Sequence, residues 1–194
     1  MSNLTVSAPS GTTGNLNTDD MIFVFGSNEQ GKHNGGAALA ANRNKGAEYH
    51  VGFGKKGKSF ALPTCSRSTS EPNFEISPET LRYYIYCFIL FAKMVQAGEF
   101  ANSSDPIPAD TKFQVTRIGT GLAGWTDAVV APLFAAAPDN CYFDLAWKDI
   151  LGDSRNYWGT YGQLVPAGGV TAPVAAAPDA SVATSDPLSL TAGN

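Results

Sequence analysis

The stretch MIFVFGSNEQGKHNGGAALAA, Met21 to Ala41, joins an apolar run to an alanine-rich segment through a glycine-rich turn. Met21 to Phe25 has the length and composition of a buried strand, and a helix is expected from about Gly36 to Lys45, ended by Gly46. The intervening glycines either cradle a phosphate or serve only the tight turn, and both interpretations stay open. A strand followed directly by a helix indicates an α/β fold.

A long helix is predicted in the middle of the chain. Ser77, Pro78 and Glu79 are typical of a helix start, because Ser caps the first turn, Pro suits the first helical position, and an acid is favourable there. The helix is expected to extend to about Ala97 and to end at Gly98. Its predicted core face follows helical spacing and consists of Leu81, Ile85, Phe88, Ala92 and Val95.

Further strands and one more helix complete the alternation. The strand candidates are Ser59 to Leu62 followed by Pro63, Lys112 to Ile118, and, as a last strand, Asn140 to Leu145. Thr126 and Asp127 are expected to cap a helix through about Ala137, kinked at Pro132. The alternation predicts a sheet with helices on both faces.

Size and composition fit one folded domain with tails. The 194 residues are 43% hydrophobic and 15% charged, and the formal net charge of −4 argues against broad nucleic-acid binding. The three cysteines stand far apart without a histidine cluster, so neither a zinc site nor a disulfide framework is expected. We expect no signal peptide, and the longest apolar run, Tyr83 to Ala92, is too short to span a bilayer. A soluble cytoplasmic protein is predicted.

The two ends of the chain differ in composition from its middle. Residues 1–19 are rich in Ser, Thr, Gly and Asn, and residues 162–194 are rich in Ala, Pro, Ser and Val without aromatic or basic residues. Such segments cannot build a core of their own. We therefore expect an N-terminal arm (1–19), one α/β domain (20–161) and a low-complexity C-terminal arm (162–194). An Ala/Pro-rich arm can lie extended across a partner subunit at modest entropic cost.

Two glycine-dense loops follow predicted strands and lead into predicted helices. The first lies within the opening stretch, and the second is IGTGLAGWTD, Ile118 to Asp127. Ligands of α/β sheets bind where strands end and helices begin. Such loops bring several backbone N–H groups to one anion, and a helix N-terminus adds about half a positive charge.

The order of these features resembles the macro domain family, whose members bind ADP-ribose or its derivatives and in some cases remove ADP-ribose from modified macromolecules. IFVFGSN, GGAALAA, SFALPT, a long helix and the G-x-G-x-x-G-shaped loop Gly119 to Gly124 follow the family order over about residues 20–150. The resemblance is closest to a divergent phage and bacterial branch. It implies a three-layer α/β/α sandwich with a mixed central sheet.

The resemblance also implies a ligand site. Asn28 would contact the distal ribose, the first loop would line the diphosphate, and the second loop would wrap it. Trp125 would stack on a base or wall the cleft, although packing is the commoner role of such a residue. The ligand-binding candidates are Asn28, Gly35, Gly36, Ala37, Gly119, Thr120, Gly121, Leu122, Ala123, Gly124 and Trp125.

No residue is assigned to catalysis. His33 could act as a general acid or base near neutral pH, but an exposed loop residue is the more frequent outcome. No second acid stands beside it in sequence. Asp127 is the nearest candidate, and its position also suits a helix N-cap. Any activity would resemble that of an ADP-ribosyl hydrolase.

Two classes of function remain open. One is a macro-like module that binds an ADP-ribose-type or NAD-derived nucleotide without catalysis. The other is a phage virion component, a capsid decoration or tail protein, that reuses the fold and assembles through its arms with other subunits or copies. The first would work in the cytoplasm and the second in the host cell or virion. Neither predicts a nucleic acid, a membrane, a metal or a cofactor.

Overall fold

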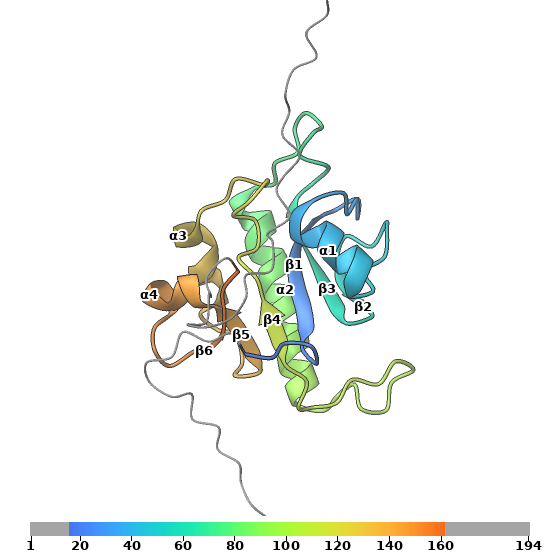
Figure 1. Ribbon diagram of the computed structural model, residues 1–194, viewed down its shortest axis with the longest axis vertical. Coiled ribbons are helices and arrows are strands. Elements are labelled where there is room, and N and C mark those ends of the chain that lie inside the picture. Colours follow the sequence, from blue (N-terminus) through green and yellow to red (C-terminus); the bar gives the residue numbers. More distant parts are fainter. Residues whose placement is uncertain (1–15, 162–194) are drawn as a thin grey trace, which may run out of the picture. The chain divides into compact units, whose positions relative to one another are not determined.

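The structure is a computed structural model that describes residues 16–161 (Figure 1). The predicted C-terminal arm and all but the last residues of the N-terminal arm lie outside this part. The described elements, in chain order, are β1 (Ile22–Asn28), α1 (Gly36–Asn44), β2 (Gly54–Lys56), β3 (Ser59–Cys65), α2 (Pro78–Gln96), β4 (Phe113–Val115), α3 (Asp127–Val130), η1 (Ala131–Phe134), β5 (Cys141–Asp144), η2 (Leu145–Trp147), α4 (Lys148–Leu151) and β6 (Asn156–Gly159).

Six strands of this part form one sheet in the order β2-β3-β1-β4-β5-β6. Every neighbouring pair is parallel except β2 and β3, which form an antiparallel hairpin at one edge. The predicted α/β class is therefore confirmed, with a mixed and mostly parallel sheet. Because β1 lies between β3 and β4, the loops that follow these three strands meet at the same end of the sheet.

The alternation of side chains along β1 divides the core between the two faces of the sheet. Ile22 and Val24 pack in the larger cluster with the inner face of α2, whereas Phe23 and Phe25 pack with Ala41 of α1. Successive side chains of a strand point to opposite faces, so helices cover both. The core face predicted for the long helix is confirmed, because all five of its side chains are buried: Leu81, Ile85, Phe88, Ala92 and Val95.

The ends of the long helix also follow the sequence signals. Ser77 is the N-cap of α2, and its Oγ accepts a hydrogen bond from the Thr80 N–H at 3.1 Å. Pro78 occupies the first helical position, and Gly98, just beyond the helix, has a φ of +78°. At the shorter helix, Gly46 with a φ of +76° follows the end of α1. Both predicted glycine stops are confirmed.

Three expectations are wrong in detail. β3 continues through Pro63 to Cys65; because β2 pairs only as far as Ala61, the missing N–H of Pro63 removes no ladder bond on that side. The predicted helix from Thr126 is a single α-helical turn followed by the 3₁₀ segment η1, because Pro132 lacks the N–H that an α-helix needs. β5 is not the last strand, since β6 follows it.

Candidate functional site

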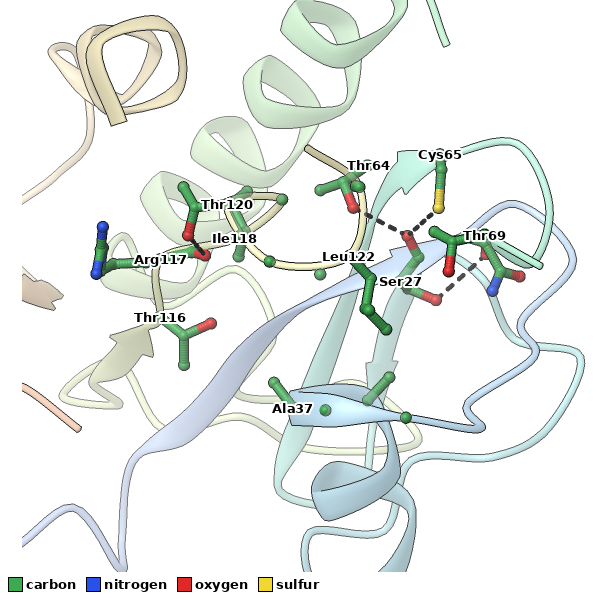
Figure 2. Close-up of a pocket in the computed structure, with 18 of the residues that line it drawn as sticks. Ser27, Ala37, Thr64, Cys65, Thr69, Thr116, Arg117, Ile118, Thr120 and Leu122 are labelled. Atoms are coloured by element: carbon green, nitrogen blue, oxygen red, sulfur yellow. Dashed lines mark hydrogen bonds between the residues drawn. The ribbon is translucent and has the colours of Figure 1, made fainter. Parts of the chain in front are cut away.

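A cavity of about 480 Å³ lies where the parallel strands end (Figure 2). Its wall includes the ends of β1, β3 and β5, the start of α1, and the loop that follows β4. Both predicted glycine-dense loops therefore face one space. Of the predicted ligand-binding residues, the cavity brings together Asn28, Gly35, Gly36, Ala37, Gly119, Thr120, Gly121, Leu122 and Ala123.

The start of α1 forms one wall and is uncapped. Gly35 is the N-cap without a side chain to accept a hydrogen bond, and the first turn contains no acidic residue. The Leu39 N–H donates to the Gly35 carbonyl at 3.1 Å. The N–H groups of the three residues between them have no intrahelical acceptor, because a helix leaves its first N–H groups unpaired. These residues, Gly36, Ala37 and Ala38, all line the cavity.

The loop after β4 forms the opposite wall. The Trp125 N–H donates to the Gly119 carbonyl at 3.0 Å and closes the loop. The backbone N–H groups of Gly121, Leu122 and Ala123 have no hydrogen-bond partner within residues 16–161. Since these three residues line the cavity, two separate sets of unpaired donors border it.

The two walls approach each other at one point. A Cβ atom built on Gly35 would lie 3.5 Å from Leu122 Cδ1, and Leu122 extends from its loop toward the start of α1 in Figure 2. Leu122 is 72% exposed, so it forms a rim of the cavity and is not part of the core. An apolar side chain therefore narrows the gap between the two walls.

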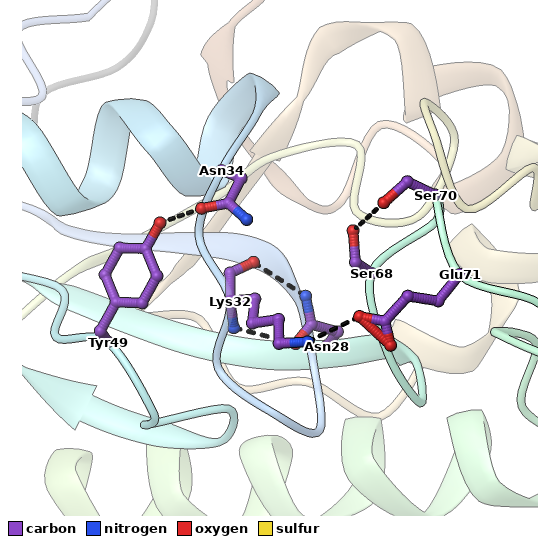
Figure 3. A network of polar contacts seen from close by, with 7 residues as sticks. All are labelled: Asn28, Lys32, Asn34, Tyr49, Ser68, Ser70 and Glu71. Atoms are coloured by element: carbon purple, nitrogen blue, oxygen red, sulfur yellow. Dashed lines mark hydrogen bonds and ion pairs between the residues drawn. The ribbon is translucent and has the colours of Figure 1, made fainter.

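Asn28 lines the cavity, but its amide also holds the first loop (Figure 3). Its Nδ2 donates to the Lys32 carbonyl at 2.8 Å, and its Oδ1 accepts from the Lys32 N–H at 3.0 Å. An amide nitrogen carries two hydrogens, so one donor of Asn28 remains for a ligand. The Lys32 Nζ in turn pairs with Glu71 at 2.6 Å.

His33 is fully buried, so the expectation of an exposed loop residue is wrong. Its ring packs edge-on against Phe25, and its Nε2 lies 3.0 Å from the Ser27 Oγ. Ser27 also donates to the Asn28 carbonyl, so we assign His33 Nε2 as the donor and Nδ1 as a bare acceptor. Burial lowers the pKa of His33. His33 does not line the cavity, and within the described chain no carboxylate meets its Nδ1.

Asp127 also lies away from the cavity lining. Its carboxylate accepts hydrogen bonds from Arg117, with Nε to Oδ1 at 3.0 Å, and from Trp147 Nε1 at 2.6 Å. The Arg117 guanidinium holds the pKa of Asp127 below its usual value. Thr126, not Asp127, occupies the N-cap of α3. Asp127 therefore fixes Arg117 at the cavity wall.

Gly124 and Trp125 are not among the residues that line the cavity. Trp125 packs against the larger core cluster, and its Nε1 donates to the Thr64 carbonyl at 2.8 Å. In this position Trp125 ties the loop after β4 to the end of β3. Of the two roles considered for Trp125, stacking on a base and packing, the structure describes the packing role.

Sequence reasoning missed several cavity residues. Lys32, Ser68 and Thr69 lie at the end beside β3, and Asp144 and Tyr161 lie at the end beside β5 and β6. Asp144 is 2% exposed, and its Oδ1 accepts from the Ala146 N–H at 2.9 Å. The hydroxyl-rich run after SFALPT was a usable signal for Ser68 and Thr69. Nothing local in the sequence pointed to Asp144 or Tyr161.

No protein-family model matches the chain, and no curated protein matches it at a significant level. Within residues 16–161, no group of three or more His, Cys, Asp or Glu side chains is arranged to hold a metal ion. In the same range, no helix has the length and apolar character needed to cross a bilayer.

Proposed function

We propose that the chain is a macro domain-like module that binds an ADP-ribose-type or NAD-derived nucleotide without breaking a bond in it. One observation carries the proposal: the unpaired N–H groups at the start of α1 and those of residues 121–123 line the same cavity. A diphosphate offers acceptor oxygens to both sets at once, and the α1 dipole favours its charge. The cavity volume of about 480 Å³ falls within the usual range for small-molecule sites.

The order of the strands supports an elongated ligand with a central diphosphate. Because the sheet runs β3-β1-β4-β5-β6, the donor-rich loops lie in the middle of the cavity, and polar side chains lie toward both ends. Ser68 and Thr69 offer hydroxyls at the β3 end. Asp144 offers a carboxylate at the other end, which suits the amino or hydroxyl donors of a base or a ribose.

The pairing of the charged side chains in the cavity wall supports binding of the ligand mainly by backbone N–H groups. Lys32 is paired with Glu71, and Arg117 is paired with Asp127. Neither cation is free to neutralise a phosphate without losing its partner. We therefore expect a moderate affinity, with a dissociation constant of roughly 1–100 µM.

A binding role without catalysis is supported by the placement of the two weak catalytic candidates. His33 is buried and its Nε2 is hydrogen-bonded to Ser27. The Asp127 carboxylate already accepts hydrogen bonds from Arg117 and Trp147. A general acid or base must come within hydrogen-bond reach of the substrate. The alternative of a virion component depends on the terminal arms, which lie almost wholly outside the described residues.

Isothermal titration with ADP-ribose tests the proposal. A saturable signal is expected, weaker for AMP, which lacks the diphosphate and the second ribose. Gly121→Val is expected to weaken binding at least about tenfold, because Gly121 lines the cavity, has open space where a Cβ would stand and needs no positive φ. Absence of both heat and a thermal shift at about 1 mM ligand would refute the proposal.

A matched pair of glycines separates loss of the site from loss of stability. Gly36 and Gly124 have φ angles of +52° and +75°, and neither has an atom within 4 Å of a built Cβ. Only Gly36 lines the cavity. Gly36→Val and Gly124→Val therefore impose similar backbone strain. The first should abolish binding, and the second should leave it measurable.

A further inference from the structure

Asp144 is a buried carboxylate in the cavity wall that lacks an ion-pair partner. The residue is 2% exposed and lines the cavity at the end of β5. Its Oδ1 accepts a hydrogen bond from the Ala146 N–H at 2.9 Å, and this bond caps the segment η2. Within residues 16–161, no cation forms an ion pair with Asp144 and no second donor meets its carboxylate. Because a buried charge is costly without donors, this end of the cavity favours a ligand that donates hydrogen bonds.

Arg117 is a cation of the cavity wall that the Asp144 charge reaches, but its hydrogen bonds go to Asp127. The guanidinium donates from Nε to the Asp127 Oδ1 at 3.0 Å and forms an ion pair with the same carboxylate. The hydrogen bond to Asp127 is the main cause of the raised pKa of Arg117, and the Asp144 charge is a smaller one. One cation therefore faces two carboxylates, and the negative charge of Asp144 is only partly offset.

An aromatic ring lies at the same end of the cavity. Asp144 pairs with Gly159 in the ladder between β5 and β6, and Tyr161 follows two residues later. Tyr161 lines the cavity and is 63% exposed, and its ring centroid lies 5.0 Å from that of Trp158. An exposed ring that is supported by a second ring is a surface on which a base can stack. A base stacked there would present its edge to the neighbouring carboxylate.

The order of the strands separates this carboxylate from the unpaired N–H groups by a suitable distance. The N–H groups of residues 36–38 follow β1, and those of residues 121–123 follow β4. β5 is two strands from β1, with β4 between them, which corresponds to roughly 10 Å. A diphosphate held by the N–H groups therefore leaves space for one ribose between itself and a base at Asp144.

We infer that this end of the cavity selects guanine, so that the preferred ligand carries a guanosine diphosphate group. The inference rests on the proposed function and specifies the base of its nucleotide. An ionised carboxylate only accepts hydrogen bonds and has about four lone-pair sites, of which the Ala146 N–H uses one. Guanine presents two donors side by side, N1–H and the 2-amino group, which match the two carboxylate oxygens. Such charge-assisted bonds are roughly twice as strong as neutral ones.

Other purine bases match the Asp144 carboxylate less well. Adenine presents one amino group beside the bare N1, whose lone pair would face the second carboxylate oxygen. Hypoxanthine keeps N1–H but lacks the 2-amino group, and xanthine has a carbonyl in place of that group. A hydrogen bond to a charged acceptor contributes more than one between neutral groups, so each missing donor is expected to weaken binding at least about tenfold.

Isothermal titration of the full chain with GDP, IDP and ADP tests the inference. The three ligands share the ribose and the diphosphate, so differences in their dissociation constants report on the base alone. GDP should bind at least about tenfold more tightly than IDP and than ADP. Equal constants for the three nucleotides would overturn the inference and leave the proposed function standing. No heat with any of them or with ADP-ribose would refute both.

Asp144→Asn tests the residue itself. Asparagine caps a helix about as well as aspartate, so it keeps an oxygen for the Ala146 N–H and turns the other oxygen into an NH₂ donor. The ratio of XDP to GDP affinity should rise at least about tenfold over the wild type, because the C2 carbonyl of xanthine accepts from that donor.

Asp149→Asn is the matched control for this variant. Asp149 is an exposed acid of α4 that does not line the cavity, so its loss should leave the order of the nucleotides unchanged. Circular dichroism establishes that each variant is folded. A folded Asp144→Asn chain that loses GDP without gaining XDP, or that still prefers GDP as the wild type does, would overturn the inference. If that variant does not fold, the wild-type comparison of GDP, IDP and ADP decides.

Discussion

The Lys32 ammonium and the Glu71 carboxylate form an ion pair at 2.6 Å that joins the loop after β1 to the loop after β3 (Figure 3). The loop after β3 is closed at its base, because the Ser66 N–H donates to the Phe74 carbonyl at 2.7 Å. Its Ser68 and Thr69 line the cavity, as does Lys32. The pair therefore fastens one end of the cavity and withholds a cation from any anionic ligand.

Glu71→Gln is expected to tighten ADP-ribose binding about threefold to tenfold at low salt, because it releases Lys32 to a ligand oxygen. The gain should shrink at high salt, where charges at a partly exposed site are screened. Titration calorimetry at two ionic strengths measures both effects. Glu75→Gln is the control, since it removes an exposed charge of the same segment without releasing Lys32. Equal gains from both variants would contradict a specific role for the pair.

His33 gives the fold a dependence on pH. Burial lowers its pKa from the ordinary 6.5, so between that value and the lower folded pKa the unfolded chain binds more protons. The free energy of unfolding should therefore be at its full value above pH 6.5 and fall as the pH drops through this window. His33→Gln should flatten this part of the profile. Urea unfolding between about pH 7.5 and 5 measures the difference; parallel profiles for wild type and His33→Gln would refute the prediction.

The loop after β4 needs glycine at one position for two reasons. Gly119 has a φ of +74°, and a Cβ there would lie 2.9 Å from Trp125 Cδ1 and 3.2 Å from Thr64 Cγ2. Gly124 has nearly the same φ, +75°, with open space around it. Gly124→Ala should cost about 1 kcal/mol of backbone strain. Gly119→Ala should cost roughly 1–3 kcal/mol more, because it also overpacks the loop. Equal losses in urea unfolding would mean that the contact with Trp125 is unimportant.

Local signals explain which parts of the fold are predictable from the sequence. The limits of α2 follow from Ser77, Pro78 and Gly98, whose effects act within one helical turn. β2 and β6 have only three and four residues and exist through their neighbours: Lys55 pairs with Phe60, and Tyr157 pairs with Phe143. Such pairings depend on tertiary contacts that no short window of sequence contains.

The candidate site divides in the same way. The two glycine-dense loops are visible in the sequence because glycine allows the turns they need. Asp144 lies near these loops only because β5 lies beside β4. No short segment of the sequence specifies that order of strands. The burial of His33 is likewise set by Phe25 and Ser27, which become its neighbours when the loop folds back onto β1.

The central claim is that one diphosphate meets both sets of unpaired N–H groups. Amide-resolved NMR of the ¹⁵N-labelled chain, titrated with ADP-ribose, tests it most directly. The account predicts that the amide signals of residues 36–38 and 121–123 shift together along one saturation curve, while those of α2 stay in place. Shifts confined to one of the two sets, or no shift in either at about 1 mM ligand, would contradict it.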